Sequence, residues 1–149
     1  KDKNNILNTG LIHQDGEFPL VGLVYLTEDA DINAGTSIML PNKRYESNSE
    51  LAERKKVLYK KSQEKLLKSD LEDYKKLILD TNKNFEESVR FNNIFNRLIT
   101  YSGQDFHKCN SFYSGKKERL TLVFFVKKIQ TNAYPPLQRS KANLIKFSS

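Results

Sequence analysis

The sequence predicts a mainly β domain with a helical insertion near its middle. Short apolar and β-branched runs, bounded by glycine, proline or acidic turns, occur towards both ends of the chain, and this pattern is typical of strands. Between them lies a stretch whose apolar residues recur at near-helical spacing. The chain has 149 residues, of which 38% are hydrophobic, and this is enough for one domain with its own core.

The first strands are expected between residues 5 and 41. The run PLVGLVYLT (19–27) is followed by the acidic turn EDAD, and the run GTSIMLP (35–41) ends at a proline. We expect Gly35 to relieve crowding or to allow a bulge where the second run begins. Both runs are therefore predicted as strands of one β core.

The helical insertion is predicted over residues 45–95. Ser47 with Glu50 and Ser69 with Glu72 fit the capping box, in which a serine and a glutamate three residues later bind the free amides of a helix start. We therefore expect two helices, or one helix broken near Ser69. The apolar residues at near-helical spacing are Leu51, Leu58, Leu66, Leu67, Leu71, Tyr74, Ile78 and Phe85.

The pattern returns to strand after the insertion. The runs RLITYSG (97–103), DFHKC (105–109) and RLTLVFFVKKI (119–129) are predicted as strands, and the last of them has the strongest strand pattern. The C-terminal tail, residues 130–149, is predicted to be irregular, because its two adjacent prolines lack amide donors and fix the backbone. The whole chain, residues 1–149, is expected to be a single domain.

Composition restricts the class of protein. The single cysteine, Cys109, excludes an internal disulfide and a thiolate zinc site, and we expect it to be a small buried filler. No apolar run reaches the roughly 18 to 20 residues that a membrane span needs. These features predict a soluble, cytoplasmic protein without a membrane partner.

The net charge of +7 raises the question of a nucleic-acid partner. The lysines of residues 54–76 are interleaved with glutamates, and this pattern is typical of a solvated helix face. A binding surface for nucleic acid would instead place lysines on one face, with exposed aromatic residues for stacking. A basic nucleic-acid-binding domain therefore ranks last among the possible functions.

Two histidines and one aspartate are candidate metal ligands. His13 and Asp15 lie two positions apart, and alternate side chains of a strand point to the same side. His107 is the other histidine of the chain, and sheet pairing would bring it opposite the first two. Two histidines and one carboxylate on one face of a metal form the facial triad of non-haem iron(II) oxygenases, which leaves coordination positions open.

A candidate carboxylate-binding pair begins the last predicted strand. Arg119 lies twelve residues after His107, and Thr121 follows two positions later on the same face of the strand. The planar fork of a guanidinium binds a carboxylate through two parallel hydrogen bonds, which a lysine cannot do. The order His-x-Asp, distal His and Arg-x-Thr therefore suits an iron oxygenase that uses an oxo acid.

With these residues the chain resembles the 2-oxoglutarate and iron(II)-dependent dioxygenases, in particular their prolyl-4-hydroxylase-like branch. The matching pieces are HQD (13–15), LVGLVYLTEDADINAGTSIML (20–40) and NRLITYSGQDFHKCNSFYSGKKERLTLVFF (96–125). The resemblance implies a double-stranded β-helix, which is a cupin-like jelly roll of two facing sheets. It also implies that the iron(II) ligands are His13, Asp15 and His107.

The resemblance further implies that Arg119 binds the remote carboxylate of 2-oxoglutarate, with Thr121 assisting. Tyr25 is a third candidate for co-substrate binding, because Tyr25, Tyr101 and Met39 lie in strands that could line the pocket; core packing is the alternative for all three. The implied reaction is oxidative hydroxylation with 2-oxoglutarate and oxygen as co-substrates. The prime substrate, a peptide or a small molecule, is not specified, because selectivity resides in loops and insertions.

Two further expectations follow. The first core strand and supporting helices of this family precede the His-x-Asp motif, so we expect the domain to continue before residue 1.

The alternative function is a cupin-like module that binds a metal or a small acid without oxidising anything. Formation of succinate would distinguish the oxygenase from this module.

Overall fold

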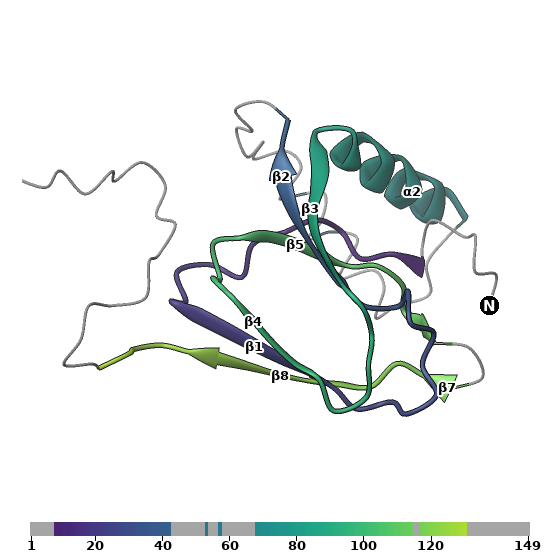
Figure 1. Cartoon of the computed structure of the whole chain (residues 1–149). Helices are drawn as coiled ribbons and strands as arrows, with labels where there is room; N and C mark the ends of the chain where they lie inside the picture. Colours follow the sequence, from purple (N-terminus) through teal and green to yellow (C-terminus); the bar gives the residue numbers. More distant parts are fainter. Residues whose placement is uncertain (1–7, 43–52, 54–56, 58–67, 115–116, 131–149) are drawn as a thin grey trace, which may run out of the picture.

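The computed structural model describes residues 8–42, 53, 57, 68–114 and 117–130 (Figure 1). Most of the helix predicted before residue 68, including the capping box at Ser47, lies outside the described residues, as does the tail from residue 131 onward. Among the described residues, no helix is long and apolar enough to cross a membrane.

The first sheet has three antiparallel strands in the order β4-β1-β8. The central strand β1 (Leu20–Tyr25) pairs with β4 (Leu98–Tyr101) on one side and with β8 (Thr121–Val126) on the other. Side chains alternate between the two faces of a strand, so one face of this sheet is apolar and buried. The buried residues of this face are Val21, Leu23, Tyr25, Ile99 and Tyr101.

The second sheet also has three antiparallel strands, in the order β3-β2-β5. Strand β2 (Thr36–Pro41) lies between β3 (Phe85–Phe91) and β5 (Phe106–Cys109). The register between β2 and β3 shifts between Ile38 and Met39, as in a β-bulge. A short hairpin then connects β5 to β8; it consists of β6 (Tyr113–Ser114) and β7 (Lys117–Glu118).

The two sheets face each other, an arrangement compatible with a β-sandwich (Figure 1). Ile38 of β2 and Phe91 of β3 pack against the buried cluster of the first sheet. The ring of Tyr101 in β4 lies 4.6 Å from the ring of His107 in β5, so the sheets also meet at this point. The prediction of a mainly β fold is confirmed, and each predicted strand run contains an observed strand that is shorter than the run.

Helix α2 (Lys68–Asn82) lies within the predicted insertion and begins one residue before Ser69. Its apolar face is buried, and Ile78 has no exposed surface. The helix ends where the side-chain amide of Asn84 donates a hydrogen bond of 3.0 Å to the carbonyl of Asp80. This bond satisfies one of the last carbonyls of the helix, which have no partner inside it.

The predicted helix is wrong for residues 83–95, because helix α2 ends at Asn82 and residues 85–91 form strand β3. Phe85 lies seven residues after Ile78 and therefore fits the helical spacing of the preceding segment. In the structure Phe85 is 7% exposed and packs with Ile12 and Met39. Pairing with β2 provides hydrogen-bond partners for the backbone of residues 85–91 and still buries Phe85. Both a helix and a strand would bury this phenylalanine, and the tertiary contacts select the strand.

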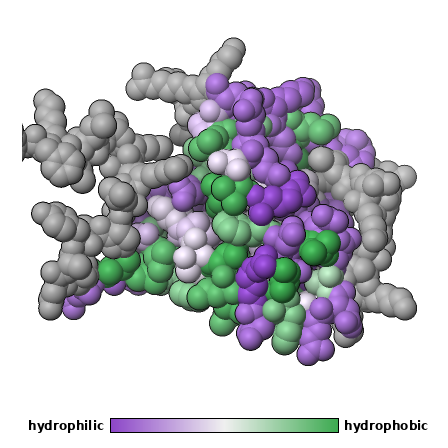
Figure 2. All heavy atoms as spheres, in the orientation of Figure 1, coloured by the Kyte–Doolittle hydropathy of each residue, from purple (hydrophilic) through white to green (hydrophobic). Residues whose placement is uncertain are grey.

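Strand β8 has apolar side chains exposed on both faces. Leu122, Val123, Phe124 and Phe125 are 53%, 41%, 39% and 47% exposed. Within the described residues β8 pairs only with β1, so it is an edge strand of the first sheet. No neighbouring strand in this part of the chain covers the side chains that lie near its outer edge. In Figure 2 hydrophobic side chains are visible along the lower part of the molecule, where Figure 1 places β8.

Gly35 is expected to be required for the pairing of β2 with β3. A Cβ atom at this position would lie 1.8 Å from the backbone oxygen of Phe91, and a backbone atom cannot move aside cheaply. We therefore expect Gly35→Ala to lower the free energy of unfolding by about 3 kcal/mol, as severe overpacking does. Urea denaturation, followed by circular dichroism, measures this change.

Gly22→Ala is the matched control for this prediction. A Cβ atom at Gly22 would lie 2.0 Å from the ring of Phe124. That ring is partly exposed and can turn away, so the cost should stay below about 1.5 kcal/mol. Equal loss of stability in the two variants would show that the close approach at Gly35 is not what makes glycine necessary there.

Candidate metal centre

Backbone pairing brings His13 opposite His107. The amide of His13 donates to the carbonyl of His107 at 3.0 Å, and the amide of His107 donates back to His13 at 2.9 Å. The amide of Gly10 donates to the carbonyl of Cys109, and that of Asp15 to the carbonyl of Gly103. Three of these bonds hold the segment that contains His13 along the outer edge of β5, and the fourth joins Asp15 to the turn between β4 and β5.

The three candidate ligands converge on one point. The Nε2 atom of His107 lies 3.3 Å from Oδ2 of Asp15, and Nε2 of His13 lies 3.6 Å from Oδ1 of the same carboxylate. One donor atom from each residue lies within 4.8 Å of the other two. A metal ion bound at about 2.0 to 2.2 Å brings neighbouring donors to roughly 3 Å of each other. A small adjustment would therefore let all three bind one ion.

Both imidazole rings are oriented by the main chain. Nδ1 of His13 lies 2.8 Å from the carbonyl oxygen of Leu11, and Nδ1 of His107 lies 3.0 Å from that of Asp105. A carbonyl oxygen only accepts hydrogen bonds, so each Nδ1 carries a proton and donates it to the main chain. Each Nε2 atom is therefore the ring nitrogen that faces Asp15 and that would bind a metal, which is the arrangement usual for histidine ligands.

The group is closed on one side and open on the other. The side chains of His107 and Asp15 are 6% and 15% exposed, whereas that of His13 is 37% exposed. The ring of Tyr101 packs against His107 on the closed side. Solvent and ligands therefore reach the group from the side of His13.

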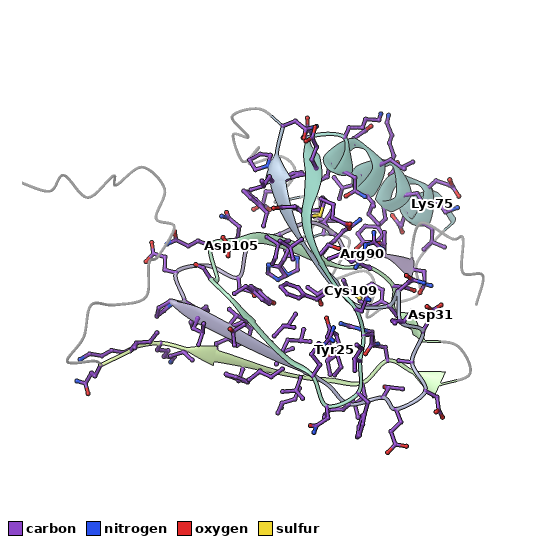
Figure 3. All side chains as sticks on the ribbon, viewed as in Figure 1. Tyr25, Asp31, Lys75, Arg90, Asp105 and Cys109 are labelled. Carbon is purple, nitrogen blue, oxygen red and sulfur yellow. The ribbon has the colours of Figure 1, made fainter. Side chains whose placement is uncertain are left out.

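A second polar group lies inside the sandwich around Arg119. The guanidinium carbon of Arg119 lies 5.4 Å from the centre of the Tyr25 ring, close enough for a cation–π contact. Backbone bonds fix this position, since Leu120 donates to Oγ1 of Thr27 at 2.8 Å and accepts from the amide of Leu26 at 3.0 Å. In Figure 3, Tyr25 lies in the interior between the two sheets.

Several polar atoms of this second group are buried without a hydrogen-bond partner in the described part of the chain. They are Nε and Nη2 of Arg119, the hydroxyl of Tyr25 and Oγ1 of Thr36. Nε and Nη2 form the edge of a guanidinium that binds a carboxylate through two bonds. Leaving a buried polar atom unpaired costs about 1 to 3 kcal/mol, and the guanidinium edge of Arg119 is therefore the part of this group most in need of a partner.

Burial and neighbouring charges determine the protonation of the groups that face this interior. Burial raises the pKa of the Tyr25 hydroxyl, while hydrogen bonding with the nearby Thr36 hydroxyl and the charge and hydrogen bonding of Arg119 lower it in part, so these three side chains interact with one another. Burial also raises the pKa of the Cys109 thiol, which donates to the carbonyl of Ser111 at 3.2 Å. Both groups therefore keep their protons at neutral pH, and Cys109 is an unreactive thiol. Figure 3 shows Cys109 in the same interior as Tyr25.

The remaining predicted site residues take three different positions. Thr121 lies directly opposite Tyr25 in the pairing of β8 with β1. Tyr101 belongs to the interior and contacts His107. Met39 does not line the site, because it packs with Ile12 and Phe85 in a separate cluster.

Thr36 and the two carbonyls that orient the histidines are the parts of the site that the sequence did not reveal. Thr36 is 2% exposed and lies opposite Cys109 in the pairing of β2 with β5. Its only signal in the sequence is a hydroxyl in an apolar strand run, and threonine is common in strands without any function. The carbonyls of Leu11 and Asp105 carry no sequence signal, because every residue has one.

Comparison of the chain with protein-family models, curated proteins and solved structures finds no match. The candidate function therefore rests on the chemistry of the residues and on their geometry.

Proposed function

We propose that this chain is a 2-oxoglutarate- and iron(II)-dependent dioxygenase that hydroxylates a peptide or a small molecule. The observation that carries the proposal is the presence of two complementary groups between the same two sheets. One is the set of donors His13, Asp15 and His107, and the other is the unpaired guanidinium edge of Arg119. An oxo acid with a second carboxylate would bind the metal through its oxo-acid end and the guanidinium of Arg119 through its remote carboxylate.

The donor set fits iron(II). Two imidazole nitrogens and one carboxylate on one face, with the other positions free, are characteristic of non-haem iron(II) oxygenases. No cysteine belongs to the set, and this agrees with a metal of intermediate softness. When bound, the iron would couple oxygen activation to decarboxylation of the oxo acid, so that one oxygen atom enters succinate and the other enters the prime substrate.

The protein residues would bind, orient and shield the reactants. His13, Asp15 and His107 would hold the iron from one side and leave three positions for the oxo acid and oxygen. Arg119 would bind the remote carboxylate, with the hydroxyls of Tyr25 and Thr36 as further donors. The interior between the sheets would keep water away, and the exposed side of His13 would admit the prime substrate.

The order of the strands supports a double-stranded β-helix. The chain visits the two sheets in turn: the His13 segment pairs in the second sheet, β1 in the first, β2 and β3 in the second, β4 in the first, β5 in the second and β8 in the first. Repeated crossing between facing sheets is the way in which a jelly roll is wound. This winding brings the ends of several strands to one site.

The test of the proposal is formation of succinate. Supplied with iron(II), 2-oxoglutarate and oxygen, the protein is expected to release succinate even without a prime substrate, although slowly. Nuclear magnetic resonance of the reaction mixture measures the product, and an anaerobic reaction and His107→Ala are the controls that should release none. Binding of iron and of the oxo acid without succinate would instead favour the non-oxidising cupin-like module.

A further inference from the structure

Tyr101 lies between the candidate iron ligands and the group around Arg119. It is the last residue of β4, it belongs to the buried face of the first sheet, and it is 8% exposed. Its ring centre lies 4.6 Å from that of His107, with an angle of 47° between the ring planes. The ring therefore forms part of the wall next to one candidate iron ligand.

The hydroxyl of Tyr101 is influenced by charges at both ends of the site. Burial raises the pKa of this hydroxyl, the negative charge of Asp15 raises it further, and Arg119 partly lowers it. Asp15 is a candidate iron ligand and Arg119 belongs to the second polar group, so the charges of both groups act on this hydroxyl. It remains protonated at neutral pH, and in the described part of the chain it donates no hydrogen bond.

We propose that Tyr101 is a further residue of the co-substrate site, and that its hydroxyl donates a hydrogen bond to the oxo acid at the end that binds the metal. This inference rests on the proposed function and adds to it. The remote end already has unpaired donors on Arg119, Tyr25 and Thr36. The ring contact with His107 places Tyr101 beside the other end.

Two parts of the side chain have separable roles in this proposal. The ring supports His107 through their contact, so it positions an iron ligand. The hydroxyl touches the co-substrate. Tyr101→Phe keeps the ring and removes the hydroxyl alone, whereas Tyr101→Leu removes both. The two variants therefore distinguish binding of the oxo acid from support of the iron ligand.

The experiment is an anaerobic titration of the iron(II)-loaded protein with 2-oxoglutarate. It follows the charge-transfer absorption band that an oxo acid gives when it chelates iron(II). Tyr74→Phe is the matched control, because Tyr74 is a half-buried tyrosine of α2 outside the site. The dissociation constant of iron is measured separately for each variant.

Tyr101→Phe should bind 2-oxoglutarate about 10- to 100-fold more weakly than the parent, as expected for one hydrogen bond to a charged group. Its absorption band should shift, because the electron density of the chelating group changes, while its iron affinity stays that of the parent. Tyr101→Leu should also lose iron affinity, and Tyr74→Phe should behave as the parent.

Two results would overturn the inference alone. One is a Tyr101→Phe variant with the affinity and the absorption band of the parent. The other is equal loss of iron and oxo-acid affinity in Tyr101→Phe, which would assign a purely structural role to the hydroxyl. Absence of the band in the parent is a different result, because it would overturn the proposed function and the inference together.

Discussion

Asp15→Ala is expected to abolish iron(II) binding, with a loss of affinity greater than about 100-fold. Asp15 is the only anionic member of the candidate triad, and its two oxygens face the Nε2 atoms of His13 and His107. The variant would leave two neutral imidazoles for a divalent cation. Changes to residues that merely orient metal ligands already cost about 10- to 100-fold, so loss of a ligand itself should cost more. Anaerobic titration of iron(II) against a competing chelator measures the effect.

Glu17→Ala is the matched control for Asp15→Ala. Glu17 is an exposed carboxylate two residues further along the chain and outside the triad, so its removal changes the net charge equally. This variant should bind iron as the parent does. A parent protein that does not bind iron(II), or equal losses in the two variants, would show that the three residues form an ordinary polar cluster.

Arg119→Leu is expected to lower the affinity for 2-oxoglutarate by roughly 30-fold to 4,000-fold, with iron affinity unchanged. If Arg119 binds the remote carboxylate as proposed, the variant removes a charged, two-bond contact from a partly buried position, and losing such a contact costs about 2 to 5 kcal/mol. At about 1.4 kcal/mol for each factor of ten, this cost gives the stated range. Titration with 2-oxoglutarate under anaerobic conditions, followed at the charge-transfer band, measures the change.

Arg97→Leu is the matched control for Arg119→Leu. The guanidinium of Arg97 donates to the carbonyl of Asn92 at 3.3 Å, so this arginine already has a partner elsewhere. Its loss should leave the affinity for 2-oxoglutarate as in the parent. If Arg119→Leu also binds the oxo acid normally, Arg119 is not the anchor, and a different group must bind the remote carboxylate.

The strands could be predicted from the sequence because their signal is local. The runs that became β1 and β2 are apolar, β-branched and bounded by turn residues, and these features act within a few residues. Strand β3 lacked such a signal, because FEESVRF contains three charged residues and begins at a phenylalanine with helical spacing to Ile78. Pairing with β2 makes it a strand, and this pairing cannot be predicted from the residues of the segment alone.

The candidate site could be predicted in part for the same reason. His13 and Asp15 were grouped by strand alternation, which is a local rule. Thr36 was not predicted as a site residue, because only its buried position beside Tyr25 and Arg119 makes it a candidate. For Met39 both pocket lining and core packing were open, and it packs in another cluster, because the sequence does not say which face of a strand points to the site.

The sequence by itself determined which chemical groups are available: two histidines, a nearby aspartate, and an arginine at the head of an apolar strand. The tertiary structure decided that the two histidines and the aspartate come together, and that the arginine lies beside Tyr25. The paired hydrogen bonds between His13 and His107 set the register of two distant segments, and the packing of the two sheets encloses Arg119 with Tyr25. Register and packing depend on contacts between residues far apart in the chain, and a shift of one residue would turn every side chain to the other face.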